Sequence, residues 1–203
     1  MDFFLVILLS YLSGSVPFGL ILTKIFSKVD IRKIGSGNIG ATNVLRTGNK
    51  YLALITLLLD IFKGYIPVII TSQLYREFVQ LSALLAFLGH LFPIWLKFKG
   101  GKGVATYLGI LFALSIQLSL LFIFTWICVS LIFKYSSLSS MFSSFSVLVV
   151  SSIKDTALQT INPDMNIDEG LKLILFVFFI LIIFTHRRNI SNLKNKTEQK
   201  IKI

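Results

Sequence analysis

Long apolar stretches alternate with short polar ones along the whole chain. The apolar runs cover residues 2–23, 51–72, 79–96, 105–133 and 170–185, the last two allowing some latitude in length. Runs of about 18 or more residues with few charges are typical of helices that cross a bilayer. Barrel strands would instead alternate between apolar and polar positions, and the sequence lacks that pattern. The pattern predicts an all-α integral membrane protein, a polytopic helical bundle.

The composition agrees with this interpretation. Of 203 residues, 55% are hydrophobic and only 14% are charged, whereas soluble domains carry charge on about a quarter of their residues. The first run has no basic leader and no small-residue cleavage site, because its only early charge is Asp2. We therefore expect a retained first span rather than a signal peptide.

The distribution of charge predicts the orientation in the membrane. Fifteen of the 20 Lys and Arg residues lie in 24–50, 97–102 and 186–203, whereas 154–169 is acidic. Cytoplasmic loops collect Lys and Arg. We therefore predict that the three basic segments and the C-terminus are cytoplasmic and that the N-terminus and 154–169 are outside.

This orientation requires an odd number of membrane crossings. Residues 105–133 are long for one helix at 1.5 Å per residue and can form one tilted span or two short ones. Residues 138–153 are apolar enough to cross but rich in serine. We predict seven transmembrane helices, with five as the alternative.

The segment GSGNIGATNVLR, residues 35–46, concentrates small polar residues between two apolar runs. Its glycines match G-x-G-x-x-G, but a dinucleotide site would need a preceding strand, so that interpretation is discarded. Glycines let backbone N–H groups approach an anion, and arginine can bind phosphate through two hydrogen bonds. A tight loop with helix caps is the alternative. We favour an anion site, with these candidate ligands: Gly35, Ser36, Gly37, Asn38, Thr42, Asn43 and Arg46.

A second glycine-rich segment, GHLFPIWLKFKGGKGVAT, covers residues 89–106. Gly101, Lys102 and Gly103 suggest a flexible turn that holds a phosphate. The spacing does not fit a Walker loop. A plain hairpin with lysines reaching toward the membrane surface is almost equally compatible with the sequence.

The third basic segment, HRRNISNLKNKTEQK, begins where the last apolar run ends, at residue 186. Such a flank often binds anionic lipid. His186 and Asn189 differ, because their i, i+3 spacing puts them on one face if the helix continues. A histidine at the bilayer edge can donate to a phosphate or carry a proton near neutral pH.

Polar residues also occur within the apolar runs. Asp60 and Lys63 are spaced i, i+3 in the second run, and facing the bundle interior as a pair would reduce the cost of their burial. A structural ion pair is at least as plausible as a catalytic role. Pro17 in the first run frees a backbone carbonyl group. The sequence shows no metal-ligand constellation, and we predict no metal and no cofactor.

These motifs resemble a known family. In the order in which they occur, they are similar to those of the bacterial acyl-phosphate:glycerol-3-phosphate acyltransferases over nearly the whole chain. GSGNIGATNVLR and FKGGKGVAT (98–106) match completely. The third motif matches at His186 and Asn189, but Asn192 stands where an arginine is expected and Lys196 where a glycine is expected.

The resemblance implies that an acyl phosphate and glycerol 3-phosphate give lysophosphatidate and phosphate, the first step of phospholipid biosynthesis. The H-x-x-x-x-D pair of acyl-CoA-dependent acyltransferases is missing, since Trp95 follows His90 and Ser191 follows His186 at that spacing. The implied catalytic residues are Ser36, Arg46, Lys102, His186 and Asn189. The first motif would bind the acyl phosphate, and Lys102, His186 and Asn189 would bind glycerol 3-phosphate.

The resemblance also implies the location of the protein and its partners. We expect one polytopic acyltransferase domain over residues 1–203, in the bacterial inner membrane, with its active site at the cytoplasmic face. The expected partners are the two substrates, membrane lipid and an acyltransferase that produces acyl phosphate, but no nucleic acid. A transporter of phosphorylated solutes and a structural membrane subunit remain as alternatives.

Overall fold

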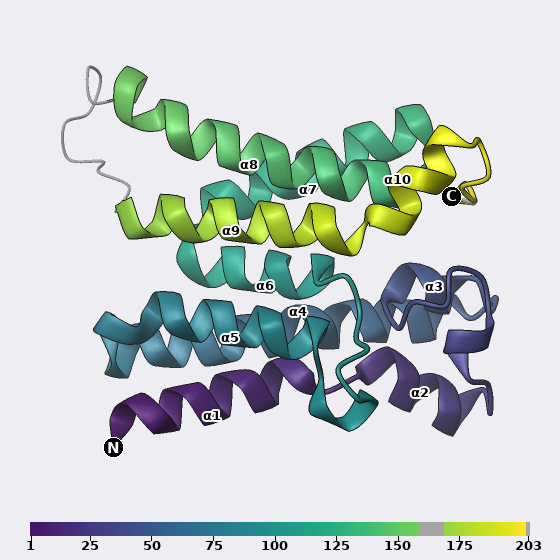
Figure 1. Ribbon diagram of the computed structural model, residues 1–203, viewed down its shortest axis with the longest axis horizontal. Helices are drawn as coiled ribbons and strands as arrows, with labels where there is room; N and C mark the ends of the chain where they lie inside the picture. Colours follow the sequence, from purple (N-terminus) through teal and green to yellow (C-terminus); the bar gives the residue numbers. More distant parts are fainter. Residues whose placement is uncertain (159–168, 202–203) are drawn as a thin grey trace. The chain divides into compact units, whose positions relative to one another are not determined.

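The computed structural model describes residues 1–158 and 169–201, and the regular elements in these ranges are helices (Figure 1). The all-α prediction is confirmed. The acidic segment 154–169 falls mostly outside the described residues. The chain divides into two compact units, Met1–Leu114 and Ser115–Ile203.

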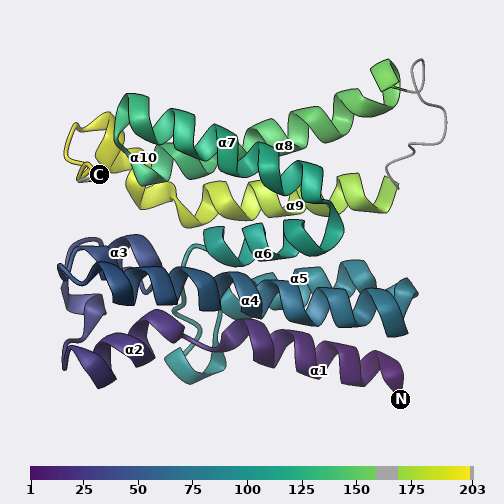
Figure 2. The same ribbon diagram turned by 180° about the vertical axis from the view of Figure 1, so that it is seen from behind.

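The first unit holds six α-helices and three short 3₁₀ helices. The α-helices are α1 (Asp2–Ser15), α2 (Phe18–Phe26), α3 (Ala41–Leu45), α4 (Lys50–Leu74), α5 (Val79–Leu91) and α6 (Val104–Leu114). The 3₁₀ helices are η1 (Ile31–Lys33), η2 (Arg76–Phe78) and η3 (Ile94–Leu96). Helix α1 packs against α5, and α4 packs against α6, in both views (Figures 1 and 2).

The second unit holds α7 (Ile116–Phe133), α8 (Ser136–Leu158), α9 (Glu169–Thr185) and α10 (Arg187–Lys194). Helix α8 lies beside both α7 and α9. Hydroxyl groups of α8 donate to carbonyl groups of their own helix, as Ser140 and Ser143 do. These bonds explain how a serine-rich segment is accommodated in an apolar setting.

The apolar run 105–133 forms two helices, α6 and α7, that break at Ser115. Ser115 has an extended backbone, and its Oγ accepts from the N–H of Leu118 at 3.4 Å, so it caps α7. By length and composition, four of the described helices can cross a membrane, or six if the bent pairs α1–α2 and α9–α10 each form one span. The apolar helix α6 is shorter than these. The seven-span count and the orientation stay predictions.

A buried ion pair holds the bend between α1 and α2. The two helices meet at 41° around Pro17, which has no N–H to continue a helix. Lys63 Nζ donates to the carbonyl oxygen of Val16 at 2.8 Å and lies 2.6 Å from Asp60 Oδ1. Both charged side chains are only 3% exposed. The pair therefore joins α4 to the bend, which favours the structural role among the two that the sequence left open.

Glycines bring the helices of the first unit very close together. A Cβ at Gly14 would collide with the carbonyl group of Ala86, and a Cβ at Gly89 would collide with that of Tyr11. Gly64 and Gly109 are similarly close to the backbone of Thr106 and Ile61. Small residues at helix contacts are the usual means of tight packing in a membrane.

Replacing Gly89 by alanine should therefore destabilise the first unit. The added Cβ forces α1 and α5 apart, at a cost of about 2 kcal/mol. The thermal unfolding temperature of detergent-solubilised protein measures the effect. The matched control is Gly40→Ala, whose Cβ would meet nothing nearer than Asn38 Nδ2 at 3.7 Å. Equal unfolding temperatures for the two variants would contradict the packing argument.

Candidate active site

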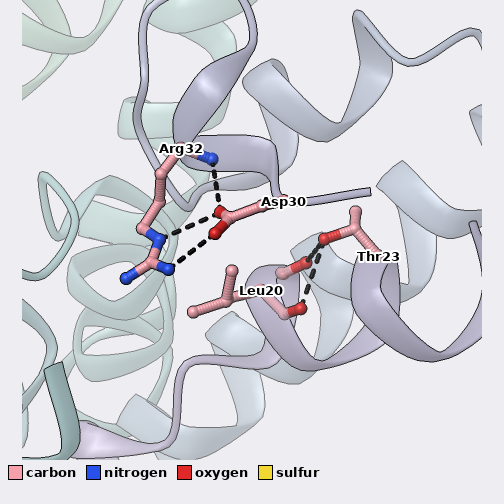
Figure 3. A network of polar contacts seen from close by, with 5 residues as sticks. Leu20, Thr23, Asp30 and Arg32 are labelled. Carbon is pink, nitrogen blue, oxygen red and sulfur yellow. Dashed lines mark hydrogen bonds and ion pairs between the residues drawn. The ribbon is translucent and has the colours of Figure 1, made fainter. Parts of the chain in front are cut away.

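The first motif follows a turn that its own polar groups stabilise. Asp30 precedes η1 and accepts from the backbone N–H of Arg32 at 3.1 Å, while its carboxylate pairs with the Arg32 guanidinium at 2.6 Å (Figure 3). The Arg32 hydrogen bond holds the pKa of the Asp30 carboxyl well below its usual range. Thr23, at the end of α2, donates to the carbonyl oxygens of Gly19 and Leu20. These local bonds shape the entry into the motif.

A cluster of buried apolar side chains anchors the first motif to the neighbouring helices. Its buried members come from α2, η1, the motif itself and α4, and they are Leu20, Ile31, Ile39, Val44, Leu52 and Ala53. Ile39 and Val44 are the inward positions of the motif, and they are 4% and 0% exposed. Burial of these side chains fixes the polar residues between them.

Asn43 organises the loop from the inside. Its Nδ2 group donates to the carbonyl oxygens of Ile31, Ile34 and Asn38 at 2.8–3.0 Å. Its Oδ1 atom accepts from the N–H of Ser36 at 3.0 Å. The side chain is 2% exposed. In this structure the Asn43 amide is used within the loop, and a phosphate contact by it stays a prediction.

Gly35 and Arg46 meet at the open side of the same loop. Gly35 has a φ of 53° and Gly37 one of 70°, a region that favours glycine. A Cβ at Gly35 would collide with Asn43 Oδ1 and with the side chain of Arg46, so Arg46 folds over Gly35. The guanidinium also lies 3.4 Å from Asn43 Oδ1. Among the described residues, Arg46 has no carboxylate partner.

Three further candidate ligands lie in this loop. Ser36 is exposed, whereas Asn38 and Thr42 are half-buried. Asn38 Oδ1 accepts from the N–H of Ile39 at 2.8 Å. The Nδ2 group of Asn38 is the part of this amide that can donate to a ligand. Thr42 lies in α3 beside Asn43. The segment that holds Arg46 thus also carries three polar side chains, from Ser36, Asn38 and Thr42.

The second motif packs tightly against the end of α5. The N–H groups of Gly100 and Gly101 donate to the carbonyl oxygens of Leu91 and His90 at 3.0 and 3.1 Å. Gly103 has a φ of 83°, and a Cβ there would collide with the ring of Phe87. The sequence suggested a flexible turn around Lys102. The structure shows that these glycines permit close packing instead.

The third motif begins at a bend. Helices α9 and α10 meet at 55°, with His186 between them, so the helix does not continue straight as the shared-face argument assumed. The Nδ1 atom of His186 lies 2.8 Å from the carbonyl oxygen of Ile182. His186 and Asn189 are both buried, at 1% and 8% exposure.

Glu198 connects the third motif to α8. Its Oε1 accepts from the Nδ2 group of Asn189 and from Ser137 Oγ, and its Oε2 accepts from Asn192 Nδ2 at 3.3 Å. The departure from the family pattern at Asn192 is therefore accommodated, because its amide supplies a donor to the carboxylate. Glu198 was not among the predicted site residues, although its place in the third motif was the available signal.

Within the described residues, no group of three or more His, Cys, Asp or Glu side chains could hold a metal ion. The first-motif loop offers a guanidinium and hydrogen-bonding side chains. Such groups bind and polarise phosphate and carbonyl oxygens.

The family model for glycerol-3-phosphate acyltransferase matches residues 4–196. The chain belongs to this family. This acyltransferase is 53% identical to a glycerol-3-phosphate acyltransferase of Pelagibacter ubique, with both chains fully covered. It is 47% identical to the one of Mesorhizobium japonicum, over 97% of this chain and 95% of the relative.

Solved structures agree with these sequence relatives. This acyltransferase matches the crystal structure of PlsY, an integral membrane glycerol 3-phosphate acyltransferase in its glycerol 3-phosphate form, with a TM-score of 0.89 and 32% identity. The match covers 100% of this chain and 96% of that one. A lysophosphatidic acid form of PlsY matches with a TM-score of 0.85 and 32% identity, over 98% of this chain and 95% of that one. The predictions of a multi-pass membrane protein and an acyltransferase are confirmed, which removes the transporter and structural-subunit alternatives.

Proposed function

We propose that this acyltransferase transfers an acyl group from an acyl phosphate to glycerol 3-phosphate, and that residues 1–203 act as one polytopic domain. The observation that carries the proposal is the first-motif loop, where Arg46 lies over Gly35 without a carboxylate partner in the described part of the chain. A guanidinium that has no carboxylate partner among the described residues is suited to a phosphate. The PlsY structures in glycerol 3-phosphate and lysophosphatidic acid forms support the acceptor and the product.

The reaction needs little covalent help from the protein. A hydroxyl oxygen of glycerol 3-phosphate attacks the carbonyl carbon of the acyl phosphate, and the bond from that carbon to the phosphate oxygen breaks. Lysophosphatidate and inorganic phosphate result. The hydroxyl proton passes to a phosphate oxygen of the substrate or to His186, and we favour the substrate oxygen. Catalysis then depends on holding two anions close together and offsetting their charge.

The motifs divide this work. Ser36, Asn38, Thr42 and Arg46 would bind the acyl phosphate. The N–H groups of Ser36 and Gly37 donate within the loop instead, to Asn43 Oδ1 and to the carbonyl oxygen of Ile34. Lys102, between Gly101 and Gly103, would bind the phosphate of glycerol 3-phosphate. The resemblance of the third motif to the family assigns His186 and Asn189 to the same substrate.

The hydrogen bonding of His186 restricts its role. A carbonyl oxygen only accepts, so the bond to Ile182 requires the proton on Nδ1. A neutral ring then carries its lone pair on Nε2, which is the acceptor atom that we propose for the glycerol hydroxyl group once glycerol 3-phosphate is bound. Such a ring orients the attacking oxygen, even when the proton finally goes to the substrate.

Replacing His186 by alanine should therefore weaken binding of glycerol 3-phosphate more than it slows the reaction. We expect the KM for glycerol 3-phosphate to rise about tenfold, with kcat falling less than about threefold. Steady-state kinetics with both substrates varied measure this. Arg187→Ala is the matched control, because that neighbouring side chain is exposed. A fall confined to kcat would instead identify His186 as the base.

The acceptor can be tested with purified protein and palmitoyl phosphate, without added metal. Labelled glycerol 3-phosphate should yield lysophosphatidate, whereas labelled glycerol should yield no acylated product, because the phosphate is what the site binds. Equal acylation of glycerol would contradict a phosphate-binding site for the acceptor.

We further propose that the protein lies in the bacterial inner membrane with the site at the cytoplasmic face, and that an enzyme producing acyl phosphate supplies the donor. The support is the concentration of basic residues in 24–50, 97–102 and 186–203. Inside-out vesicles given labelled glycerol 3-phosphate should form product faster than right-side-out vesicles. The reverse order would contradict this orientation.

A further inference from the structure

His90 is a buried polar residue to which the reaction above assigns no role. It lies in the last turn of α5 and is 4% exposed. Its imidazole ring fills the place that a side chain at Gly101 would occupy, because a Cβ there would collide with Nε2 and crowd Cε1 and Cδ2. The backbone of Gly101 is thus pressed against the ring, and Lys102 is the next residue.

The other side of the ring is held by α6. The Oγ1 atom of Thr106 lies 3.1 Å from His90 Nδ1, at hydrogen-bonding distance. Thr106 is fully buried, and it packs against Gly64 of α4 so closely that a Cβ on Gly64 would collide with its carbonyl oxygen. The ring of His90 is therefore held by Thr106 of α6, and Thr106 in turn packs against α4.

Backbone hydrogen bonds also join the loop at Gly100 and Gly101 to the end of α5. The N–H of Gly101 donates to the carbonyl oxygen of His90, and the N–H of Gly100 donates to that of Leu91. These two bonds and the ring contact together fix the backbone one residue before Lys102.

We propose that His90 is a positioning residue, whose ring, fixed by Thr106, holds the Gly101–Lys102 backbone where Lys102 meets the phosphate of glycerol 3-phosphate. This inference rests on the role proposed for Lys102. His90 does not touch the substrate, and it acts through the loop. Without a ring that Thr106 holds in place, the backbone at Gly101 is no longer fixed, and Lys102 moves out of place.

The test uses His90→Leu, which keeps an apolar filler but cannot bond to Thr106, in the full-length protein. The KM for glycerol 3-phosphate should rise about tenfold, because small displacements of a binding group are costly. The KM for palmitoyl phosphate should stay unchanged. A second variant, Thr106→Val, keeps the shape but loses the hydroxyl group, and it should raise the same KM, whereas Thr106→Ser should restore it.

Controls separate positioning from general stability. Ser82→Ala removes another buried hydrogen bond of α5, to Ser10, and should lower the unfolding temperature without changing either KM. In a Lys102→Ala background, His90→Leu should cause no further rise in the KM for glycerol 3-phosphate, because residues that act through one another are not additive.

The outcomes distinguish the two proposals. If the KM for glycerol 3-phosphate rises after Lys102→Ala but not after His90→Leu or Thr106→Val, the positioning role of His90 is overturned and the role of Lys102 stands. Independent, multiplying effects of His90→Leu and Lys102→Ala also overturn it. No effect of Lys102→Ala by itself overturns both the assignment of Lys102 and the inference built on it.

Discussion

Replacing Arg46 by alanine is expected to lower kcat/KM by roughly 10²- to 10³-fold, the cost of removing one charged donor from a site where negative charge develops. Arg46 lies over Gly35 at the open side of the first-motif loop. No carboxylate among the described residues neutralises it. The fold should survive, because the Arg46 guanidinium lies at the long distance of 3.4 Å from Asn43 Oδ1 and packs against a glycine at position 35.

Arg32→Ala is the matched control for this experiment. Arg32 belongs to the same loop region, but its guanidinium is bound to Asp30 and its side chain is 46% exposed. Its loss should change kcat/KM less than about threefold, because exposed ion pairs contribute little. Arg46→Lys should be intermediate, since lysine keeps the charge but not the two-pronged geometry. Equal effects of Arg46→Ala and Arg32→Ala would mean that only net charge matters.

Replacing Asn43 by aspartate should be almost as damaging, by a different route. The change keeps Oδ1 for the N–H of Ser36 but replaces the donor Nδ2 by an oxygen that faces three carbonyl oxygens. Unsatisfied buried groups cost about 1–3 kcal/mol each, so we expect about 3 kcal/mol of lost stability. Because the loop also shapes the site, kcat/KM should fall by roughly 10².

The control for Asn43→Asp is Asn49→Asp. Asn49 caps α4, where its Oδ1 accepts from the N–H of Leu52 at 2.9 Å, and aspartate is an equally good cap. Thermal unfolding and kinetics of the two variants should differ sharply. If Asn43→Asp kept its stability but lost activity, Asn43 would contact substrate rather than hold the loop.

The lengths of the apolar runs in the sequence were enough to predict the membrane helices. Apolar runs indicated the membrane helices, and the density of glycines around Arg46 indicated a loop with an anion-binding composition. The break at Ser115 was harder to predict from the sequence, because its only signal is a serine that caps α7 within an otherwise apolar run.

The directions of the polar side chains could not be predicted from the sequence. Asparagine donates and accepts, so Asn43 was equally compatible with facing a phosphate and with facing the loop backbone. The close packing of Gly101 on His90 depends on α5 and the second motif meeting in space. The contact of Glu198 with Ser137 depends likewise on a partner 61 residues away.

The identity of the acyl donor is the most direct test of the account. Purified protein would receive labelled glycerol 3-phosphate with either palmitoyl phosphate or palmitoyl-CoA, and lysophosphatidate and released phosphate would be counted. We predict product from palmitoyl phosphate alone, with one phosphate released for each lysophosphatidate formed. Product from the CoA ester alone would contradict a site that binds the donor through its phosphate.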